Sequence, residues 1–291
     1  MIGQTEVLKQ IDNLIQKGFP RFIVITGQKG QGKTELAKYI SKKLNYQLVE
    51  FGIRIDEIRE MIEMSYKQTE PIIYLIQNAD KMSIGAKNSL LKVIEEPSQQ
   101  AYFIMELQQM ENTLETIKSR CQQIKMESYT DKEIEEMINY IRDKDKYIFT
   151  GESKSILIHT AQNYYQIQKL LSYNVSEFYD YVDKVYNNIY KVQSANSFKI
   201  AEKLDLKDTE EGYNLEMFWN MYIYRCYIEC YNLTDYEMGN EDLTIMHILY
   251  ECIKTTEKYK QKLNINGINK VMLFDKWVMD IRKLWRSYEF I

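Results

Sequence analysis

Residues 22–34 constrain the fold of this chain more than any other part of its sequence. They open with an unbroken apolar run, residues 22–25, which is typical of a buried strand. Residues 27–34 then fit the phosphate-loop pattern G-x-x-x-x-G-K-[ST], and a helical pattern of apolar residues follows at once. A glycine turn that only caps a helix is the simpler alternative, but motif and context agree on a site for nucleotide phosphates.

Each part of this motif has a physical role. Gly27, Gly30 and Gly32 allow the backbone to fold tightly, so that its N–H groups converge on a phosphate chain. The start of the following helix adds the positive end of its dipole. We expect Lys33 to reach the β- and γ-phosphates, and Thr34 to hold Mg²⁺ through its hydroxyl when a nucleotide is bound. The predicted ligands are therefore ATP or ADP with Mg²⁺.

The composition is that of an ordinary globular protein, with 45% hydrophobic and 27% charged residues in a chain of 291. This length suggests about two or three domains. The formal net charge of −4 divides into +2 over residues 1–126 and −6 over residues 127–291. Neither part has the basic stripe of a self-sufficient nucleic-acid binder, so contact with DNA would be local or shared with partners.

The cysteine pattern and the short apolar runs indicate a cytoplasmic protein. Cys121, Cys226, Cys230 and Cys252 lack the C-x-x-C spacing of a metal site. Cys226 and Cys230 lie one helical turn apart in an apolar helix and are expected to be buried free thiols, which suits a reducing compartment. No apolar run is long enough to span a membrane, and no signal peptide is expected. With two histidines in the chain, neither histidine-based catalysis nor a His-rich metal site is expected.

Strand and helix patterns alternate over the first 126 residues. The expected strands are residues 22–26, 47–51, 71–76, 101–105 and 122–126, and helices such as residues 5–17 and 83–95 separate them. Residues 71–76 are apolar almost throughout, as in a strand that is buried on both faces of a parallel sheet. The alternation predicts an α/β fold with a doubly wound parallel sheet.

After residue 126 only helices are expected. Thr130 and Glu133 form a capping-box pattern ahead of an apolar helical repeat. The further expected helices lie within residues 152–172 and 176–190, over residues 215–233, through residues 245–252 and through residues 271–285. Their aromatic stripes are most simply interpreted as packing between helices.

Several motifs resemble those of clamp-loader subunits, which are AAA+ ATPases. Residues 88–97 closely resemble their N-x-L-L-K-x-[LI]-E-E-P motif, and residues 114–122 resemble their L-P-T-I-x-S-R-C-Q motif. Residues 263–266 and the helix after them resemble the end of the collar in delta-prime subunits of bacterial DNA polymerase III. The resemblance is strong over residues 1–126 and weak beyond. It implies an AAA+ P-loop domain over residues 1–126, a helical lid over residues 127–190 and a helical collar for oligomerisation over residues 191–291.

The resemblance also implies a role in a hetero-oligomeric ring. Such subunits assemble with gamma or tau and delta subunits, load the sliding clamp onto primed DNA, and form part of a DNA polymerase III holoenzyme. Their ATP sites lie between neighbours, and the Arg of Ser-Arg-Cys points at the γ-phosphate of the next subunit. On this resemblance Arg120 is an arginine finger, whose planar fork suits phosphate and neutralises charge in the transition state. Spacing alone would favour a surface arginine at the start of a strand.

The chain departs from an active AAA+ site at the end of residues 71–76. The family has Asp-Glu there, whereas this chain has Gln77 and Asn78. Both are neutral amides, which cannot accept a proton and bring less charge to a metal. Asp80 matches the second acid of a D-E-A-D motif and is not expected to substitute. These three residues form a degenerate Walker B segment.

Other parts of the hydrolytic machinery are also altered. The position of the polar sensor residue falls near Leu107 and Gln108, and Gln166 is the nearest candidate for the second sensor arginine. No cysteine lies between Lys33 and Asp80, where many delta-prime subunits carry a four-cysteine zinc module, so no zinc is expected. That departure leaves a divergent or phage version of the subunit open.

Three interpretations remain at this level. The favoured one is a delta-prime-like subunit that does not hydrolyse ATP alone and that completes a neighbour's site with Arg120. The second is an active gamma- or tau-like motor subunit that uses an unconventional acid. The third is a P-loop scaffold with no role in replication.

Overall fold

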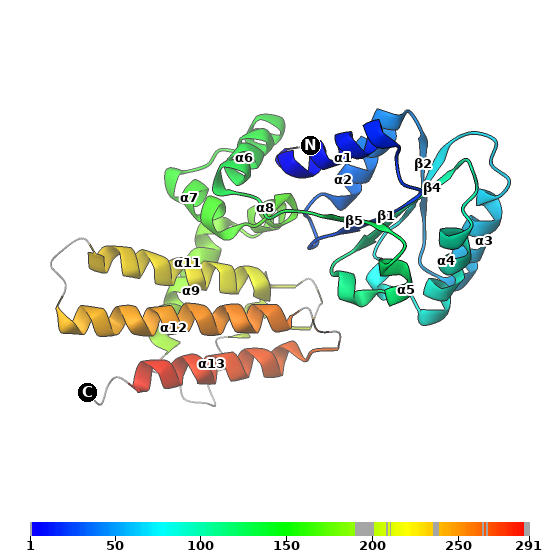
Figure 1. Ribbon diagram of the computed structural model, residues 1–291. Coiled ribbons are helices and arrows are strands. Elements are labelled where there is room, and N and C mark those ends of the chain that lie inside the picture. The colour runs from blue at the N-terminus through cyan, green and yellow to red at the C-terminus, as the bar shows by residue number, and fades with distance from the viewer. Residues whose placement is uncertain are drawn as a thin grey trace. The chain divides into compact units, whose positions relative to one another are not determined.

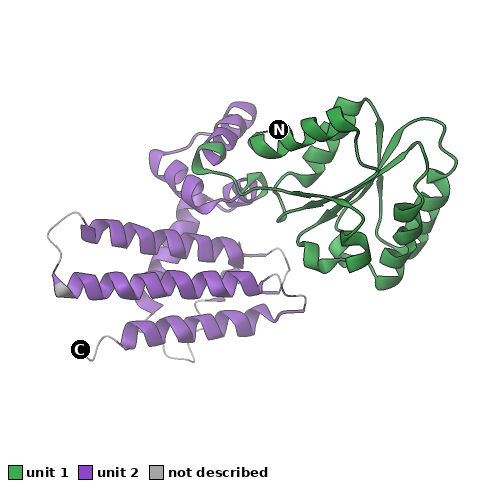
Figure 2. Ribbon diagram, viewed as in Figure 1, with its two compact units in different colours: residues 1–133, 163–165 green, residues 134–162, 166–291 purple. Residues whose placement is uncertain are grey.

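The computed structural model describes residues 2–189, 201–207, 209, 211–234, 239–263, 265 and 267–287. The chain forms two compact units, which are coloured separately in Figure 2. Unit 1 comprises residues 1–133 and 163–165, and unit 2 comprises residues 134–162 and 166–291. The division of the second part into a lid over residues 127–190 and a collar over residues 191–291 stays a prediction.

Unit 1 is built on a five-stranded sheet in which every paired strand is parallel to its neighbour (Figure 1). The strands are β1 (Phe22–Thr26), β2 (Gln47–Phe51), β3 (Ile72–Ile76), β4 (Ala101–Leu107) and β5 (Gln122–Lys125), in the spatial order β2-β3-β4-β1-β5. The predicted α/β fold with a doubly wound parallel sheet is confirmed. Because every strand runs in the same direction, all the carboxyl ends meet at one edge of the sheet, where α/β proteins bind their ligands.

Helices cover both faces of this sheet. They are α1 (Thr5–Lys17), α2 (Lys33–Leu44), α3 (Ile55–Ser65), α4 (Ile84–Glu95) and the short α5 (Glu115–Lys118), with two 3₁₀ turns, η1 (Ala79–Lys81) and η2 (Met110–Asn112). Local sequence fixes where they begin. The Ser83 hydroxyl accepts a hydrogen bond from the Ala86 amide (3.2 Å) and so caps α4.

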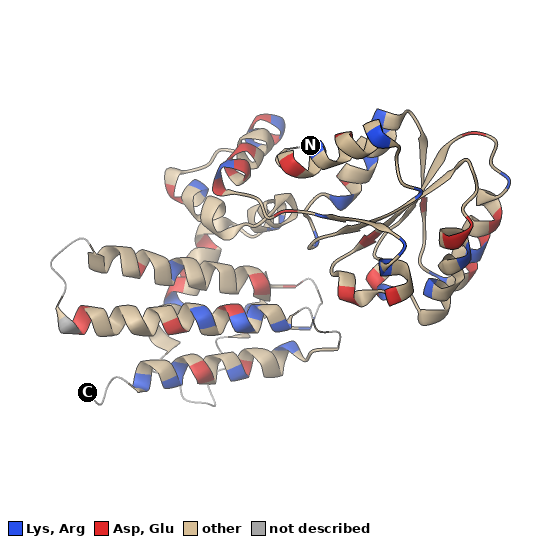
Figure 3. Cartoon of the chain, in the orientation of Figure 1, with Lys and Arg blue, Asp and Glu red and all other residues tan. Residues whose placement is uncertain are grey.

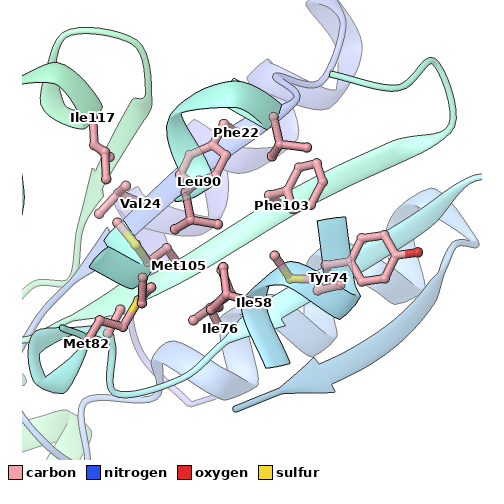
Figure 4. Packing of buried hydrophobic residues seen from close by; sticks show 14 of the residues in the cluster. Phe22, Val24, Ile58, Tyr74, Ile76, Met82, Leu90, Phe103, Met105 and Ile117 are labelled. Atoms are coloured by element: carbon pink, nitrogen blue, oxygen red, sulfur yellow. The ribbon is translucent and has the colours of Figure 1, made fainter. Parts of the chain in front are cut away.

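Alternation along the strands explains the unbroken apolar runs, because successive side chains point to opposite faces of a sheet. One core cluster combines Phe22, Tyr74, Phe103 and Met105 from the strands with residues of α3 and α4, and Figure 4 shows this packing. The other cluster combines the alternate residues of β1, β3 and β4 with apolar residues of α1 and α2. The sheet is therefore buried on both faces.

The boundaries of three strands differ from those expected. β3 begins at Ile72, one residue later than expected. β4 continues to Leu107 rather than ending at residue 105, so it includes Glu106. A carboxylate is unusual inside a buried strand. A prediction based on the run of apolar residues therefore ends the strand before Glu106. β5 ends at Lys125, one residue earlier than expected.

Unit 2 is mainly helical. Its helices are α6 (Asp131–Asp145), α7 (Gly151–Thr160), α8 (Tyr164–Ser172), α9 (Val175–Asn188), α11 (Leu215–Thr234), α12 (Asn240–Lys262) and α13 (Lys270–Arg286), of which α6 and α8 include a few residues of unit 1. The predicted capping box is present at the start of α6, where the Thr130 amide donates to Glu133 (2.8 Å) and the Glu133 amide donates to the Thr130 hydroxyl (3.3 Å). The predicted positions that lie outside the described residues include Tyr190, Ser197, Asn264 and Asn266.

The expectation that only helices follow residue 126 is wrong in one place. The two-residue strands β6 (Leu204–Asp205) and β7 (Tyr213–Asn214) pair with each other. The pairing is parallel, and Gly212, just before β7, has a φ of +92° that favours glycine; a Cβ there would lie 2.7 Å from the Lys203 carbonyl oxygen. Strands this short carry no periodic pattern, so the sequence gives no signal for them.

Aromatic side chains form much of the core between the long helices of unit 2. α11, α12 and α13 lie side by side (Figure 1), and Trp277 packs edge-on against Tyr222 with ring centroids 5.0 Å apart. The Trp277 indole donates to the Thr256 hydroxyl (3.0 Å), which donates to the Cys252 carbonyl (2.7 Å). The aromatic stripes read from the sequence are therefore packing residues.

The surfaces of these helices carry both signs of charge. In Figure 3, acidic and basic residues are interspersed along α12 and α13. No helix within the described residues has the length and the apolar composition that a bilayer crossing needs.

We expect Leu90→Ala to destabilise unit 1 by about 2–5 kcal/mol, because Leu90 is fully buried between α4 and the sheet and its truncation leaves a cavity. Ile84→Ala on the same helix is the matched control, since Ile84 is 71% exposed and its truncation should cost less than about 1 kcal/mol. Thermal unfolding of the full chain by far-ultraviolet circular dichroism measures both. Equal losses from the two variants would contradict the packing of α4 described above.

Candidate functional site

The phosphate loop lies where sequence reasoning expects it, between the end of β1 and the start of α2. Gly30 and Gly32 both have φ of +87°, a left-handed conformation that favours glycine. A side chain on Gly30 would also collide with Asn163. Gly27 is nearly extended, but a Cβ there would lie 2.5 Å from Gln31 Oε1. All three glycines are therefore needed by the loop as it is folded.

Side chains from distant parts of unit 1 hold this loop. The Gln31 side-chain oxygen accepts from the Gln28 amide (2.6 Å), and the Tyr129 hydroxyl donates to the Gln31 carbonyl (2.9 Å). The Asn163 amide donates to the Lys29 carbonyl (3.2 Å). Sequence reasoning missed these three roles, because a single sequence does not show which distant residues meet.

Lys33, on the first turn of α2, folds over the loop. Its ammonium donates to the carbonyl oxygens of Gly27 (2.6 Å) and Gln28 (2.9 Å). Burial lowers the pKa of Lys33, while the carboxylates of Glu106 and Asp80 oppose that change. The ammonium therefore lies at the loop backbone, where phosphate oxygens can compete with the two carbonyls for it.

A buried carboxylate lies beside the loop. Glu106, on β4, is 5% exposed, and its Oε2 accepts a hydrogen bond from the Thr34 hydroxyl (3.3 Å). Burial raises the pKa of the Glu106 carboxyl, while the Thr34 hydrogen bond and the charge of Lys33 lower it. This residue was absent from the expected site. Its signal was a single acidic residue in the apolar run that begins at residue 101.

The degenerate Walker B residues follow β3 directly. Gln77 is half-buried, and Asn78 is exposed with φ of +53°. The carboxylate of Asp80 accepts from the Gln108 amide (3.0 and 2.8 Å) and from the Asn112 side chain (2.8 Å). Asp80 therefore ties the segment after β3 to the segment after β4, which leaves it poorly placed to act as a substitute base.

The expected sensor residues include Leu107 and Gln166, whose surroundings the structure describes. Leu107 is fully buried and packs in the cluster with α3 and α4, on the other face of the sheet from α2. Gln166, in unit 2, accepts from the Gln162 amide (2.9 Å) and donates to Glu216 (3.3 Å). These contacts give Gln166 a structural role within its own unit.

Arg120 lies on the surface of unit 1, between α5 and β5. Its guanidinium donates to the Thr116 carbonyl (3.2 Å) and to the Ser119 hydroxyl (3.3 Å), and its Nε lies 3.4 Å from a Glu95 oxygen. The side chain is 44% exposed. Exposed pairs of this kind contribute about 0–1 kcal/mol, so the guanidinium can leave them for another anion.

The cysteines are free thiols, as expected. Burial raises the pKa of Cys121 to about 11 and that of Cys252 to about 12. These two thiols therefore stay protonated at neutral pH and are poor nucleophiles.

Comparisons with known proteins extend this description. The family model described as "DNA polymerase III, delta subunit" matches residues 46–130. The chain is 28% identical to DNA polymerase III subunit gamma of Buchnera aphidicola over 54% of its length, and 27% identical to subunit tau of Bacillus subtilis over 55%. It is 26% identical to subunit delta' of Bacillus subtilis over 46% of its length. The matches span 52%, 34% and 51% of these relatives, so the chain spans about half or less of their length.

Among solved structures, the Thermotoga maritima RuvB Holliday junction branch migration motor has a similar fold, with a TM-score of 0.51 at 14% identity. The similarity covers 80% of this chain and 76% of that one. The parallel sheet and the loop between β1 and α2 thus define an α/β protein of the P-loop type. The family model and the curated relatives further support a place within the clamp-loader family of DNA polymerase III.

The buried carboxylate has a consequence for stability. Because burial raises the pKa of Glu106 above its ordinary value of 4.5, the folded state binds this proton more tightly than the unfolded state. Stability is therefore lost as pH rises above 4.5 and through the folded-state pKa. We expect Glu106→Gln to be more stable than wild type by at least about 1 kcal/mol at neutral pH, with the difference shrinking in acid.

Thermal unfolding in EDTA between about pH 4.5 and pH 8 measures this difference. Glu111→Gln is the control, because Glu111 is exposed in η2 and its neutralisation should leave the pH profile unchanged. A Glu106→Gln profile parallel to that of wild type would show that burial does not perturb this carboxyl.

Proposed function

We propose that this protein is a delta-prime-like clamp-loader subunit that binds a nucleotide without hydrolysing it and supplies an arginine finger to a neighbour. The observation that carries the proposal is the contrast within one site. The phosphate loop is complete from Gly27 to Thr34, whereas amides stand at Gln77 and Asn78 and the nearby Asp80 is held by backbone and side-chain donors. A site of this kind can hold phosphates, but the two positions after β3 supply no general base to activate water.

The exposure of Arg120 supports the second half of the proposal. An arginine finger must leave its own subunit and reach a phosphate bound by the next. Arg120 meets this need, since its three contacts within unit 1 are exposed and weak. Its neighbours in the Ser-Arg-Cys motif position it, because Ser119 ends α5 and Cys121 is half-buried just before β5.

The partners follow from the same proposal. They are gamma or tau and delta subunits in a hetero-oligomeric ring, and, through the ring, the sliding clamp and primed DNA. The interspersed charges of α12 and α13 suit contact with protein subunits better than independent binding to DNA. The setting is a cytoplasmic DNA polymerase III holoenzyme.

An active motor subunit is the second candidate. Two observations favour it: the relatives with the higher identities are gamma and tau subunits, and Glu106 brings a carboxylate to the phosphate loop. In this alternative Glu106 would serve as the unconventional acid. The two candidates differ in whether the isolated chain turns over ATP.

We expect the isolated wild-type chain to bind ATP and to release no phosphate above the level of Lys33→Ala, because no general base lies at residues 77 and 78. Lys33→Ala should weaken ATP binding at least about tenfold, since it removes the cation at the phosphates. Isothermal titration calorimetry measures binding, and a continuous phosphate assay measures turnover. Steady phosphate release that Lys33→Ala abolishes would establish the motor candidate instead.

We expect Arg120→Ala to reduce DNA-stimulated ATP hydrolysis and clamp loading by a loader reconstituted with its gamma or tau and delta partners. Loss of an arginine finger slows the affected site by about 10³–10⁵-fold in known cases, so loading should fall at least about tenfold. Arg120→Lys should also fail, because lysine keeps the charge but loses the planar fork.

Arg54→Ala is the matched control for this experiment. Arg54 is an exposed arginine of the same unit, paired with Glu57 (3.1 Å) at the start of α3. Its loss should leave loading unchanged, and both arginine variants should unfold within about 1 kcal/mol of wild type. Unimpaired loading by Arg120→Ala would reject the arginine-finger assignment.

A further inference from the structure

The carboxylate of Glu106 occupies a position that the alternation of β4 would give to an apolar side chain. Ile104 packs in the cluster with α1 and α2, whereas Met105 and Leu107 pack in the cluster with α3 and α4. Glu106 therefore points to the same face as Ile104. On that face α2 begins, and its second residue is Thr34. The strand thus directs a charged group at the first turn of the phosphate-loop helix.

One oxygen of this carboxylate lacks the partner that burial requires. Oε2 accepts from the Thr34 hydroxyl (3.3 Å), while Oε1 is buried and has no hydrogen-bond donor within the described part of the chain. The nearby ammonium of Lys33 donates instead to Gly27 and Gln28. An unpaired buried acceptor costs about 1–3 kcal/mol, and a charged one costs more. A bound ion is one explanation for a buried polar group without a partner.

The sheet register places this carboxylate beside the lost acids. Ile76, the last residue of β3, is paired with Met105 of β4, so Gln77 directly follows β3 where Glu106 directly follows Met105. On the other side, β1 pairs Ile25 with Glu106, so the phosphate loop begins two residues further on. The carboxylate that Gln77 lacks after β3 is therefore matched by the carboxylate of Glu106 on the neighbouring strand β4, at the same edge of the sheet.

We propose that Glu106 and Thr34 hold the Mg²⁺ of a bound Mg²⁺–nucleotide, so that the metal ligand of this site has moved from β3 to β4. The proposal rests on the nucleotide-binding part of the function proposed above. Mg²⁺ takes oxygen ligands and is usually bound by one or two carboxylates together with phosphates of the nucleotide. The Thr34 hydroxyl and the free Glu106 Oε1 supply such oxygens at the foot of the phosphate loop.

The charges around Glu106 are consistent with a divalent cation. The carboxylate of Glu50 and the cations of Lys33 and Lys38 are the other charged groups that act on its carboxyl. A bound Mg²⁺ would favour the ionised carboxylate far more than these ammonium groups, because it is doubly charged and would contact the oxygen directly. The carboxylate would in turn offset the charge of the metal, which Gln77 and Asn78 cannot do.

The test is the dependence of nucleotide affinity on Mg²⁺, measured by calorimetry with ADP and with ATP in Mg²⁺ and in EDTA. For wild type we expect Mg²⁺ to tighten binding at least about tenfold. For Glu106→Gln we expect this enhancement to vanish, since losing a metal partner typically costs about 10–100-fold in metal affinity. In EDTA the variant should bind as tightly as wild type or more tightly, because a carboxylate that repels phosphate is gone.

The electron paramagnetic resonance spectrum of Mn²⁺ with ADP supplies a second readout, in which Glu106→Gln should release the metal. Glu111→Gln, exposed on η2, is the control and should retain the full Mg²⁺ enhancement. If wild type binds nucleotide equally well in Mg²⁺ and in EDTA, or if Glu106→Gln keeps the enhancement, the metal assignment fails while the nucleotide site stands. If wild type binds no nucleotide under either condition, the nucleotide-binding part of the proposed function fails as well.

Discussion

The parallel pairing of β1, β3 and β4 is the constraint on which the candidate site depends. It brings the end of each strand to the same edge of the sheet, so residues far apart in the chain meet there. β1 delivers the phosphate loop, β3 delivers Gln77 and Asn78, and β4 delivers Glu106. Both faces of the sheet are buried under helices, which fixes the register, because a slip by one residue would exchange the two apolar clusters.

Asp80, which follows β3 at this edge of the sheet, has a structural role. Its carboxylate receives three hydrogen bonds, from the Gln108 amide and the Asn112 side chain. These bonds hold the segment that leads from β4 through η2 toward Arg120. Asp80 therefore positions the connection that leads from β4 toward Arg120.

Much of unit 1 could be predicted from sequence, because its signals are local. The apolar runs of residues 22–25 and 71–76 identified two central strands, and the glycine pattern identified the loop between β1 and α2. The position of Glu106 could not be predicted in the same way. Its role depends on the register between β3 and β4, which is a relation between strands and leaves no periodic trace in either one.

The side chains that hold the phosphate loop could not be predicted from the sequence for a related reason. Tyr129 and Asn163 reach the loop from 98 and 134 residues away in sequence, and an isolated tyrosine or asparagine gives no sign of such a contact. The short pair β6 and β7 was missed because two residues carry no alternation. By contrast, the aromatic residues of α11 and α13 repeat over several helical turns, so their role in helix packing could be predicted from the sequence.

Glu95 forms an ion pair with Arg120 on the surface of unit 1. The two residues belong to separate motifs, at the end of α4 and just after α5, and they meet at 3.4 Å on a solvated surface. Exposed ion pairs contribute little, so exchange of this carboxylate for another anion would need little free energy. Because exposed charges are screened over about 8 Å at physiological ionic strength, this exchange becomes easier as salt weakens the resting pair. In the proposed role as an arginine finger, Arg120 would exchange the carboxylate of Glu95 for a phosphate held by a neighbouring subunit.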